Sequence, residues 1–141
     1  MADMHHEIQI AASPDKIYDA IATVEGLRGW WTGDSIAEPR VGSTAEFGFY
    51  DRRFLFRMRI EELIPGRKVV WSCIGDHDEW QGTRLTWEII QRDRAIVLTF
   101  THGDWRSTTS FFASCNTTWG MLMYRLKDYA EGKSPGPYWE K

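Results

Sequence analysis

Apolar and polar residues alternate through most of residues 45–102. The clearest stretch is residues 54–60, in which one set of alternate positions is apolar and the other is mostly charged. A period of two places successive side chains on opposite faces of a β-strand. Five such segments follow one another, and residues 7–11 form an earlier one. Because short turns connect the five consecutive segments, the pattern favours an antiparallel sheet.

A helical pattern interrupts the strands near the N-terminus. Ser13 suits the cap of a helix and Pro14 suits its first position. The apolar residues that follow recur at helical spacing. Gly26 and Gly29 are predicted to break this helix, and residues 27–31 form a second short helical turn.

A second helical pattern predicts a long C-terminal helix from roughly Ser107 onward. Five residues share one face of it in a 4-3-4-3 spacing, namely Cys115, Trp119, Leu122, Leu126 and Tyr129. Gly132 fits the left-handed position after the helix, and residues 133–141 are expected to form a loosely attached tail. Because a long one-sided helix needs an apolar surface, we expect it to lie on the sheet. The sequence thus predicts one α+β domain over residues 1–141: a curved six-stranded antiparallel sheet around the long C-terminal helix, with two short helices after the first strand.

Composition and charge narrow the function classes. A net charge of -3 argues against general binding to nucleic acid or anionic membranes. Arginines at 53, 57 and 59 are explained by cross-strand pairing with acidic residues. No segment is apolar and long enough for membrane insertion or a signal peptide, so a cytoplasmic location is expected. Cys73 and Cys115 are interpreted as buried thiols in a reducing compartment.

The aromatic content is high, with eight Trp, seven Phe and five Tyr. By alternation, most rings on the strands point to the helix side of the sheet. They could form the wall of a ligand cavity or a filled core, and the residue types alone favour the filled core. The rings concerned are Trp31, Phe47, Phe49, Phe56, Trp71, Trp87, Phe100 and Trp119.

Two further features could carry chemistry. His102 ends an apolar strand face and could act as a general base or anchor a ligand. No nucleophile can be assigned to it, which favours a hydrogen-bonded histidine at a strand end. Residues 76–79, with His5 and His6, offer metal ligands, but neighbours in one loop rarely converge on an ion. No metal site and no cofactor are therefore predicted.

Six short motifs occur in a fixed order along nearly the whole chain. They are Ile8-x-Ile10-x-Ala12-x-Pro14-x-x-Ile17-Tyr18-x-Ala20, Gly29-Trp30-Trp31-Thr32, Val41-Gly42-x-x-x-x-Phe47, Thr83-x-Leu85-x-Trp87, Leu98-x-Phe100-x-His102-Gly103 and Trp119-Gly120-x-Leu122-x-x-x-Leu126-x-x-Tyr129. In these motifs the sequence resembles the helix-grip (START-like, Bet v 1-like, SRPBCC) superfamily, which includes polyketide cyclases. Within it, the chain is most similar to the family related to the C-terminal domain of the activator of Hsp90 ATPase.

The resemblance implies an elongated apolar cavity between sheet and helix, so it favours the cavity interpretation. The expected function is binding of a small hydrophobic or amphipathic ligand, such as a lipid, an aromatic or a polyketide-like compound, without catalysis. The expected ligand contacts are Trp31, Phe47, Phe49, Phe56, Met58, Trp71, Trp87, Phe100, His102, Cys115, Trp119 and Leu122.

Two other functions stay open. One is a cyclase- or aromatase-like enzyme in which His102 or a cavity acid moves a proton. The other is a module that interacts with a chaperone partner, although the Hsp90 activator carries an additional N-terminal domain for which this sequence has no room. Tyr138 and Trp139 in the tail are expected to dock either on the body of the protein or on the partner subunit of a homodimer.

Overall fold

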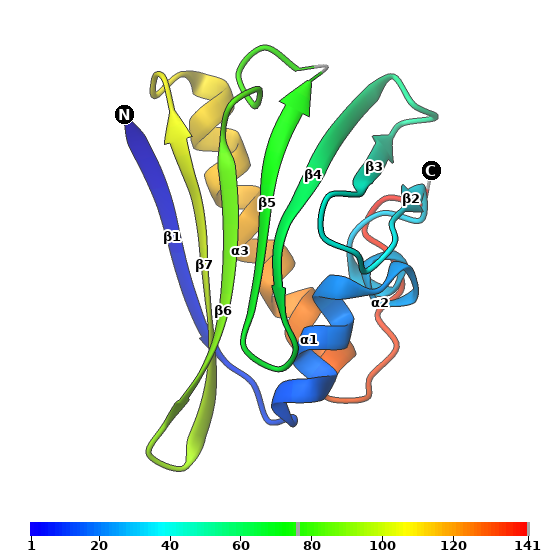
Figure 1. Ribbon diagram of the computed structural model, residues 1–141, viewed down its shortest axis with the longest axis vertical. Coiled ribbons are helices and arrows are strands. Elements are labelled where there is room, and N and C mark those ends of the chain that lie inside the picture. The colour runs from blue at the N-terminus through cyan, green and yellow to red at the C-terminus, as the bar shows by residue number, and fades with distance from the viewer. Residues whose placement is uncertain (76, 141) are drawn as a thin grey trace.

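A curved antiparallel sheet lies against one long helix in the computed structural model, which describes residues 1–75 and 77–140 (Figure 1). Over these residues the sheet has seven strands in the order β1-β7-β6-β5-β4-β3-β2. The strands are β1 (Ala2–Gln9), β2 (Ser35–Ile36), β3 (Thr44–Phe49), β4 (Phe54–Ile64), β5 (Lys68–Gly75), β6 (Arg84–Arg92) and β7 (Ala95–Trp105). The helices are α1 (Pro14–Ala22), α2 (Val24–Trp30) and α3 (Ser110–Ala130). The predicted α+β helix-grip fold is confirmed.

The seventh strand, β2, was not predicted. Ser35 pairs with Phe47 and Ile36 pairs with Glu46, so β2 extends the sheet beyond β3. Two residues are too few to show an alternating pattern, and only the backbone ladder reveals this strand. β1 also begins earlier than the alternation indicated, because its first residues pair with β7 through the backbone.

α1 begins as predicted, with Ser13 Oγ accepting a hydrogen bond from Lys16 N at 3.3 Å. Gly26 and Gly29, however, lie inside α2 and do not break a helix. Thr23 separates the two helices instead, since it is extended and its side chain accepts from Gly26 N at 3.0 Å. The two glycines permit close packing: a Cβ at Gly26 would lie 2.3 Å from the Asp19 carbonyl oxygen, and one at Gly29 would lie 2.2 Å from the Tyr129 ring.

α3 supplies the other layer of the core. It begins after Thr109, whose side chain accepts a hydrogen bond from Phe112 N at 3.2 Å, a few residues later than predicted. Its buried residues are Trp119, Leu122, Met123, Leu126 and Ala130. Trp119 packs against the fully buried Trp87 and Phe100 of the sheet, and Phe47 and Trp71 pack against Trp31. This aromatic packing positions the wall of the pocket described below.

The tail differs from the expectation of a loose attachment. Tyr138 N and Trp139 N donate to Trp31 O at 2.9 and 3.1 Å, and Gly33 N donates to Trp139 O at 2.8 Å. Arg125 Nη2 also donates to the carbonyl oxygens of residues 135 and 136. Backbone hydrogen bonds of this kind leave no periodic signal in a sequence. Of the two docking interpretations, the structure shows the tail on the body of its own chain.

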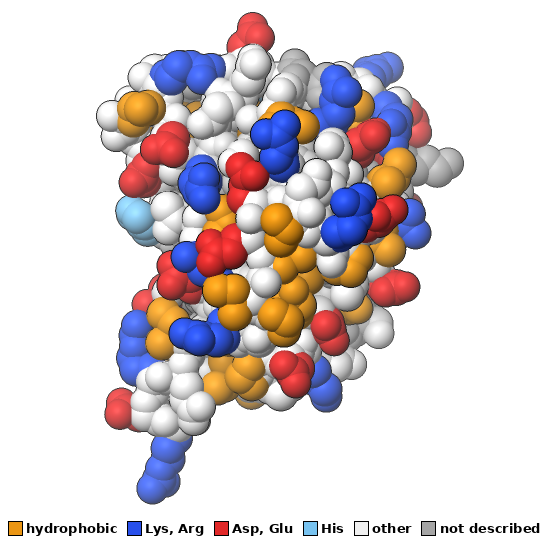
Figure 2. All heavy atoms as spheres, in the orientation of Figure 1, with side chains coloured by type: hydrophobic (Ala, Val, Ile, Leu, Met, Phe, Trp, Pro, Cys, Tyr) orange, Lys and Arg blue, Asp and Glu red, His pale blue; other side chains and the backbone are white. Residues whose placement is uncertain are grey.

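The outer face of the sheet carries interspersed acidic and basic side chains (Figure 2). Glu46 lies opposite Arg57 in the β3–β4 ladder, and Lys68 Nζ lies 3.6 Å from Glu62 Oε2. This arrangement agrees with cross-strand pairing as the explanation of the basic residues. In the described part of the chain, no helix is both long and apolar enough to cross a membrane.

Candidate functional site

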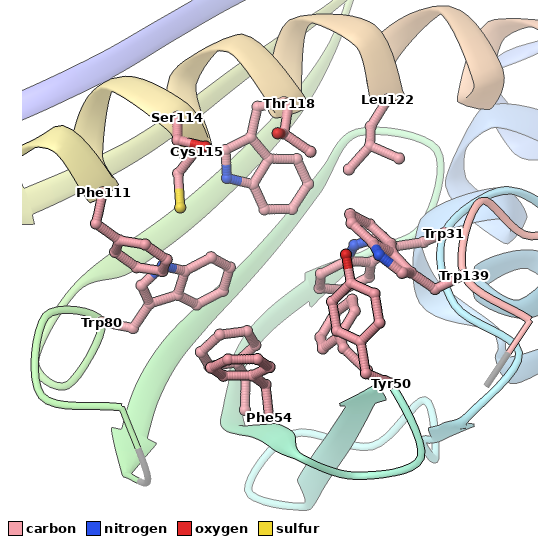
Figure 3. A pocket seen from close by; sticks show the side chains of 13 residues that line it. Trp31, Tyr50, Phe54, Trp80, Phe111, Ser114, Cys115, Thr118, Leu122 and Trp139 are labelled. Atoms are coloured by element: carbon pink, nitrogen blue, oxygen red, sulfur yellow. The ribbon is translucent and has the colours of Figure 1, made fainter.

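An apolar pocket of about 240 Å³ lies between the β3–β4 side of the sheet and the first half of α3 (Figure 3). Trp31, Trp139 and Tyr50 lie at one end, and Trp80 and Phe111 lie at the other. The lining residues are Trp31, Phe49, Tyr50, Phe54, Phe56, Trp80, Phe111, Ser114, Cys115, Thr118, Trp119, Leu122 and Trp139.

Ring contacts hold the aromatic walls in place. Trp31 and Trp119 have centroids 5.3 Å apart, and Phe56 stacks on Trp80 at 4.1 Å. Trp139 meets Phe49 edge to face at 4.9 Å. Such pairs prefer particular geometries, so they fix ring orientation as well as burying area. The pocket is therefore formed before any ligand arrives.

The mouth of the pocket is built on a left-handed turn between β3 and β4. Tyr50, Asp51 and Arg52 have φ values of 55°, 57° and 65°. This conformation costs roughly 1–2 kcal/mol per non-glycine residue. Arg52 offsets part of this cost because it donates two hydrogen bonds to Asp34, both 3.0 Å long, and a third to Glu46 at 3.2 Å. The turn leaves Tyr50 and Phe54 half exposed at the pocket entrance.

The polar groups of the pocket are few and uncharged. Ser114, Cys115 and Thr118 lie on the α3 wall, and none of the lining residues carries a charge. Burial raises the pKa of the Cys115 thiol to about 11. The thiol is therefore protonated at neutral pH and is a poor nucleophile, because the thiolate is the reactive form. The wall offers hydroxyl and thiol groups for hydrogen bonding and no ion pairing.

His102 lies behind this wall in a saturated hydrogen-bond network. Trp119 Nε1 donates to His102 Nδ1 at 3.1 Å, and an indole N–H can only donate. The neutral imidazole therefore carries its proton on Nε2, which donates to Thr83 Oγ1 at 2.9 Å. Thr83 Oγ1 in turn donates to the Trp80 carbonyl oxygen at 2.6 Å. Burial lowers the pKa of His102 to about 3, so the ring is neutral at physiological pH.

The structure divides the predicted ligand contacts into two groups. Those on the pocket surface are Trp31, Phe49, Phe56, Cys115, Trp119 and Leu122. Those packed in the core behind it, outside the pocket lining, are Phe47, Met58, Trp71, Trp87, Phe100 and His102. Alternation identifies the inner face of the sheet, but it does not say which part of that face the helix covers.

Sequence reasoning missed seven lining residues: Tyr50, Phe54, Trp80, Phe111, Ser114, Thr118 and Trp139. Most of them lie in turns, in the tail or next to the predicted apolar stripe of α3. Their aromatic content in otherwise polar segments was a usable signal, because a large ring in a polar loop usually packs against the body of the protein. Trp80 in the β5–β6 loop is the clearest case, since its ring is buried.

No group of three or more His, Cys, Asp or Glu residues with metal-binding geometry occurs within residues 1–75 and 77–140. Asp76, one of the candidate metal ligands, lies outside the described residues. His77 stacks on Phe111 with the ring centroids 4.4 Å apart, and His5 Nδ1 lies 3.1 Å from Thr101 Oγ1. These histidines have aromatic or hydroxyl neighbours in the structure.

A sheet wrapped around a C-terminal helix, with an aromatic pocket between them, defines a protein of the START-like helix-grip class. Residues 11–131 match the model of the family described as activator of Hsp90 ATPase homolog 1-like protein. Because this match spans most of the sequence, the chain belongs to that family. No match was found among curated proteins.

Solved structures agree with this assignment. An Aha1 protein from Colwellia psychrerythraea, solved as a dimer, is 37% identical with a TM-score of 0.85, and the match covers 94% of this chain and 98% of that one. A protein from Staphylococcus saprophyticus shares the fold at 17% identity and a TM-score of 0.75, with 93% of each chain covered. DynU16, encoded in the dynemicin biosynthetic locus, shares it at 19% identity and a TM-score of 0.79. That match covers 96% of this chain and 49% of DynU16.

Proposed function

We propose that this protein binds a small hydrophobic or amphipathic ligand in the pocket between the sheet and α3. The observation that supports this function is the composition of the lining, in which nine of thirteen residues are aromatic and none is charged. Apolar walls with a few hydrogen-bonding groups are typical of small-molecule sites. The three polar side chains on α3 would orient a hydroxyl or carbonyl group of the ligand.

The pocket volume limits the ligand. About 240 Å³ lies below the roughly 300–1,000 Å³ that is usual for drug-sized ligands. It exceeds the ~150 Å³ apolar cavity that takes up benzene. A substituted single ring or a short acyl chain therefore fits, whereas a full-length lipid or a polycyclic compound does not fit the pocket in this conformation.

A pair of threonine variants tests the proposal. Thr118 lines the pocket, and its neighbour Thr117 is exposed on α3. Replacing Thr118 with Phe should fill the pocket and weaken binding of 4-ethylphenol or indole at least tenfold. Isothermal titration calorimetry measures the affinity, and the melting temperature should rise with ligand only where the ligand binds the folded state.

Thr117→Phe is the matched control, because it adds the same ring outside the pocket and should leave the affinity within about twofold, less than 0.5 kcal/mol. If neither probe binds the wild-type protein, or if both threonine variants lose affinity equally, the pocket is not the binding site.

The alternative of a cyclase-like enzyme assigned proton transfer to His102 or to a cavity acid, and the pocket lining contains no Asp or Glu. Both imidazole nitrogens are already hydrogen-bonded, and the ring lies behind Trp80 and Trp119 rather than on the pocket surface. The geometry therefore gives this role no support. The chaperone-interaction alternative rests on the family description alone.

We also propose that the chain forms a homodimer. The support is the similar Aha1 protein of Colwellia psychrerythraea, which is a dimer. Analytical ultracentrifugation should give twice the mass of the 141-residue chain. A monomer mass across the full concentration range would contradict this assembly.

We infer a cytoplasmic location for this binding function. Cys73 and Cys115 do not form a disulfide with each other; Cys73 is buried and Cys115 is partly buried. Cysteines that are not oxidised to disulfides are typical of a reducing compartment. A fluorescent fusion that appears outside the cytoplasm would contradict this assignment.

A further inference from the structure

The end of the chain separates the aromatic pocket from a second, polar hollow. We call residues 138–140 the C-terminal segment. The polar hollow has a volume of about 430 Å³ and is lined by Gly33, Asp34, Asp51, Arg52 and Glu140. At two places, consecutive residues line the two spaces. Trp139 lines the pocket and Glu140 lines the hollow; Tyr50 lines the pocket and Asp51 lines the hollow. The two spaces are therefore adjacent, and the C-terminal segment runs between them.

Backbone contacts hold the C-terminal segment in this position. Its three hydrogen bonds are Tyr138 N to Trp31 O, Trp139 N to Trp31 O and Gly33 N to Trp139 O. The Arg125 guanidinium lies 5.6 Å from the centre of the Tyr138 ring. The approach to Gly33 is close, because a Cβ on this residue would lie 2.5 Å from the Glu140 carbonyl oxygen.

This wall of the pocket is less firmly anchored than the wall formed by α3. Trp119 is only 3% exposed, and its indole N–H is fixed by His102. Trp139 is partly exposed, and its ring contacts are with Phe49 and with the exposed Tyr138. Of residues 131–137, which connect α3 to the segment, 132–134 are exposed, and Arg125 Nη2 donates to the carbonyl oxygens of residues 135 and 136. Displacing the segment breaks its hydrogen bonds to Trp31 O and Gly33 N, so water or a ligand must satisfy these two backbone groups.

We propose that the C-terminal segment is a displaceable partition, and that amphipathic ligands too long for the aromatic pocket bind by moving it. The apolar part of such a ligand occupies the aromatic pocket, and its polar end extends into the hollow beside Arg52. This inference rests on the proposed binding function and adds the ligand class: a single ring or chain with a polar extension.

Hydrogen exchange of the wild-type protein gives the first test, with 4-ethylphenol as the short probe and 4-hexylphenol as the long one. NMR follows the amides of Gly33, Tyr138 and Trp139, which donate the three hydrogen bonds of the segment. Saturating 4-hexylphenol should accelerate their exchange at least tenfold, and 4-ethylphenol should not accelerate it. Bound 4-hexylphenol that leaves these rates unchanged overturns the partition.

Gly33→Ala gives the second test, because its methyl group displaces the Glu140 carbonyl without changing a residue that lines the aromatic pocket. The variant should bind 4-hexylphenol at least tenfold more tightly than the wild type and 4-ethylphenol within threefold. Gly75→Ala is the matched control, since, apart from its two chain neighbours, no described residue has an atom within 4 Å of the Cβ it would add. Equal affinity of Gly33→Ala and wild type for 4-hexylphenol overturns the inference.

The two proposals fail in different ways. The binding function stands if 4-ethylphenol binds the wild type and Thr118→Phe blocks this binding. If, in addition, 4-hexylphenol does not accelerate exchange in the segment and Gly33→Ala does not raise its affinity, only the partition is wrong. If neither phenol binds the wild type or Gly33→Ala, the binding function is wrong and the partition is overturned with it.

Discussion

His102 acts as a structural link between the sheet and the pocket wall. Its two nitrogens connect Trp119 on α3 to Thr83, the residue before β6. A buried polar group is stable only when its hydrogen bonds are made, and here each one has a partner. The network therefore fixes the ring plane of Trp119, which faces the pocket on its other side.

The aromatic residues of the site were partly predictable from their position in the sequence. Alternation correctly places Phe49 and Phe56 on the inner sheet face, and helical spacing places Trp119 and Leu122 on the inner face of α3. The same rules also placed Phe47 and Trp87 on the inner sheet face, but these two rings do not line the pocket. Phe47 packs against Trp31 and Trp71, and Trp87 packs against Phe100. Periodicity predicts the face of an element; the distance between two layers depends on how all side chains fill the space.

At the scale of elements, the alternating pattern predicted the long strands and the long helix, because each shows several periods of its repeat. β2 is only one period long, and the C-terminal segment is held by backbone groups. Neither feature depends on a repeated side-chain pattern. The order and type of the long elements were therefore predictable, while β2 and the position of the C-terminal segment were not.

The glycines of α2 give a prediction about helix packing. Gly26 faces the backbone of α1. A Cβ added at this position would lie 2.3 Å from Asp19 O and 2.6 Å from Ala20 Cα. Gly29 faces the Tyr129 side chain of α3. We expect Gly26→Ala to lower the free energy of unfolding by about 1–3 kcal/mol, as overpacking usually does. Gly29→Ala should cost less, because a side chain can turn away more easily than a backbone can.

Urea unfolding of the two variants and of Gly75→Ala checks this order. Gly75 lies in β5 with free space beside it, so its replacement should cost nothing and should favour the folded strand slightly. If Gly26→Ala is as stable as the wild type, the glycine is not needed for the approach of α1 and α2.

At the scale of the whole molecule, the core is shared by the two layers through their aromatic rings. Trp31, at the end of α2, contacts Phe47 and Trp71 of the sheet and Trp119 of α3. The pocket occupies the part of this interface where the rings do not close on one another. A change in the aromatic core is therefore expected to alter both global stability and the shape of the pocket.

The buried His102 makes the stability of the whole fold depend on pH. Burial lowers its pKa to about 3 in the folded protein, compared with 6.5 for an exposed histidine. Between these two values the unfolded chain binds a proton that the folded chain does not, so stability falls as the pH drops below 6.5 and levels off near pH 3. The expected loss from this group between pH 7 and pH 5 is about 2 kcal/mol, from a linkage of about 1.4 kcal/mol per pKa unit.

Urea unfolding at pH 7 and pH 5, with wild type and His102→Gln, isolates this contribution. Glutamine does not titrate. At pH 7 the variant should be less stable than the wild type, because it loses the fitted hydrogen bonds to Trp119 and Thr83. Its further loss on going to pH 5 should be about 2 kcal/mol smaller than that of the wild type. His6, whose pKa is also lowered mainly by burial, titrates in both proteins, so its effect cancels in the comparison. Equal losses in the two proteins would mean that His102 becomes protonated in the folded state near its ordinary pKa, and that the network around Trp119 opens readily to water.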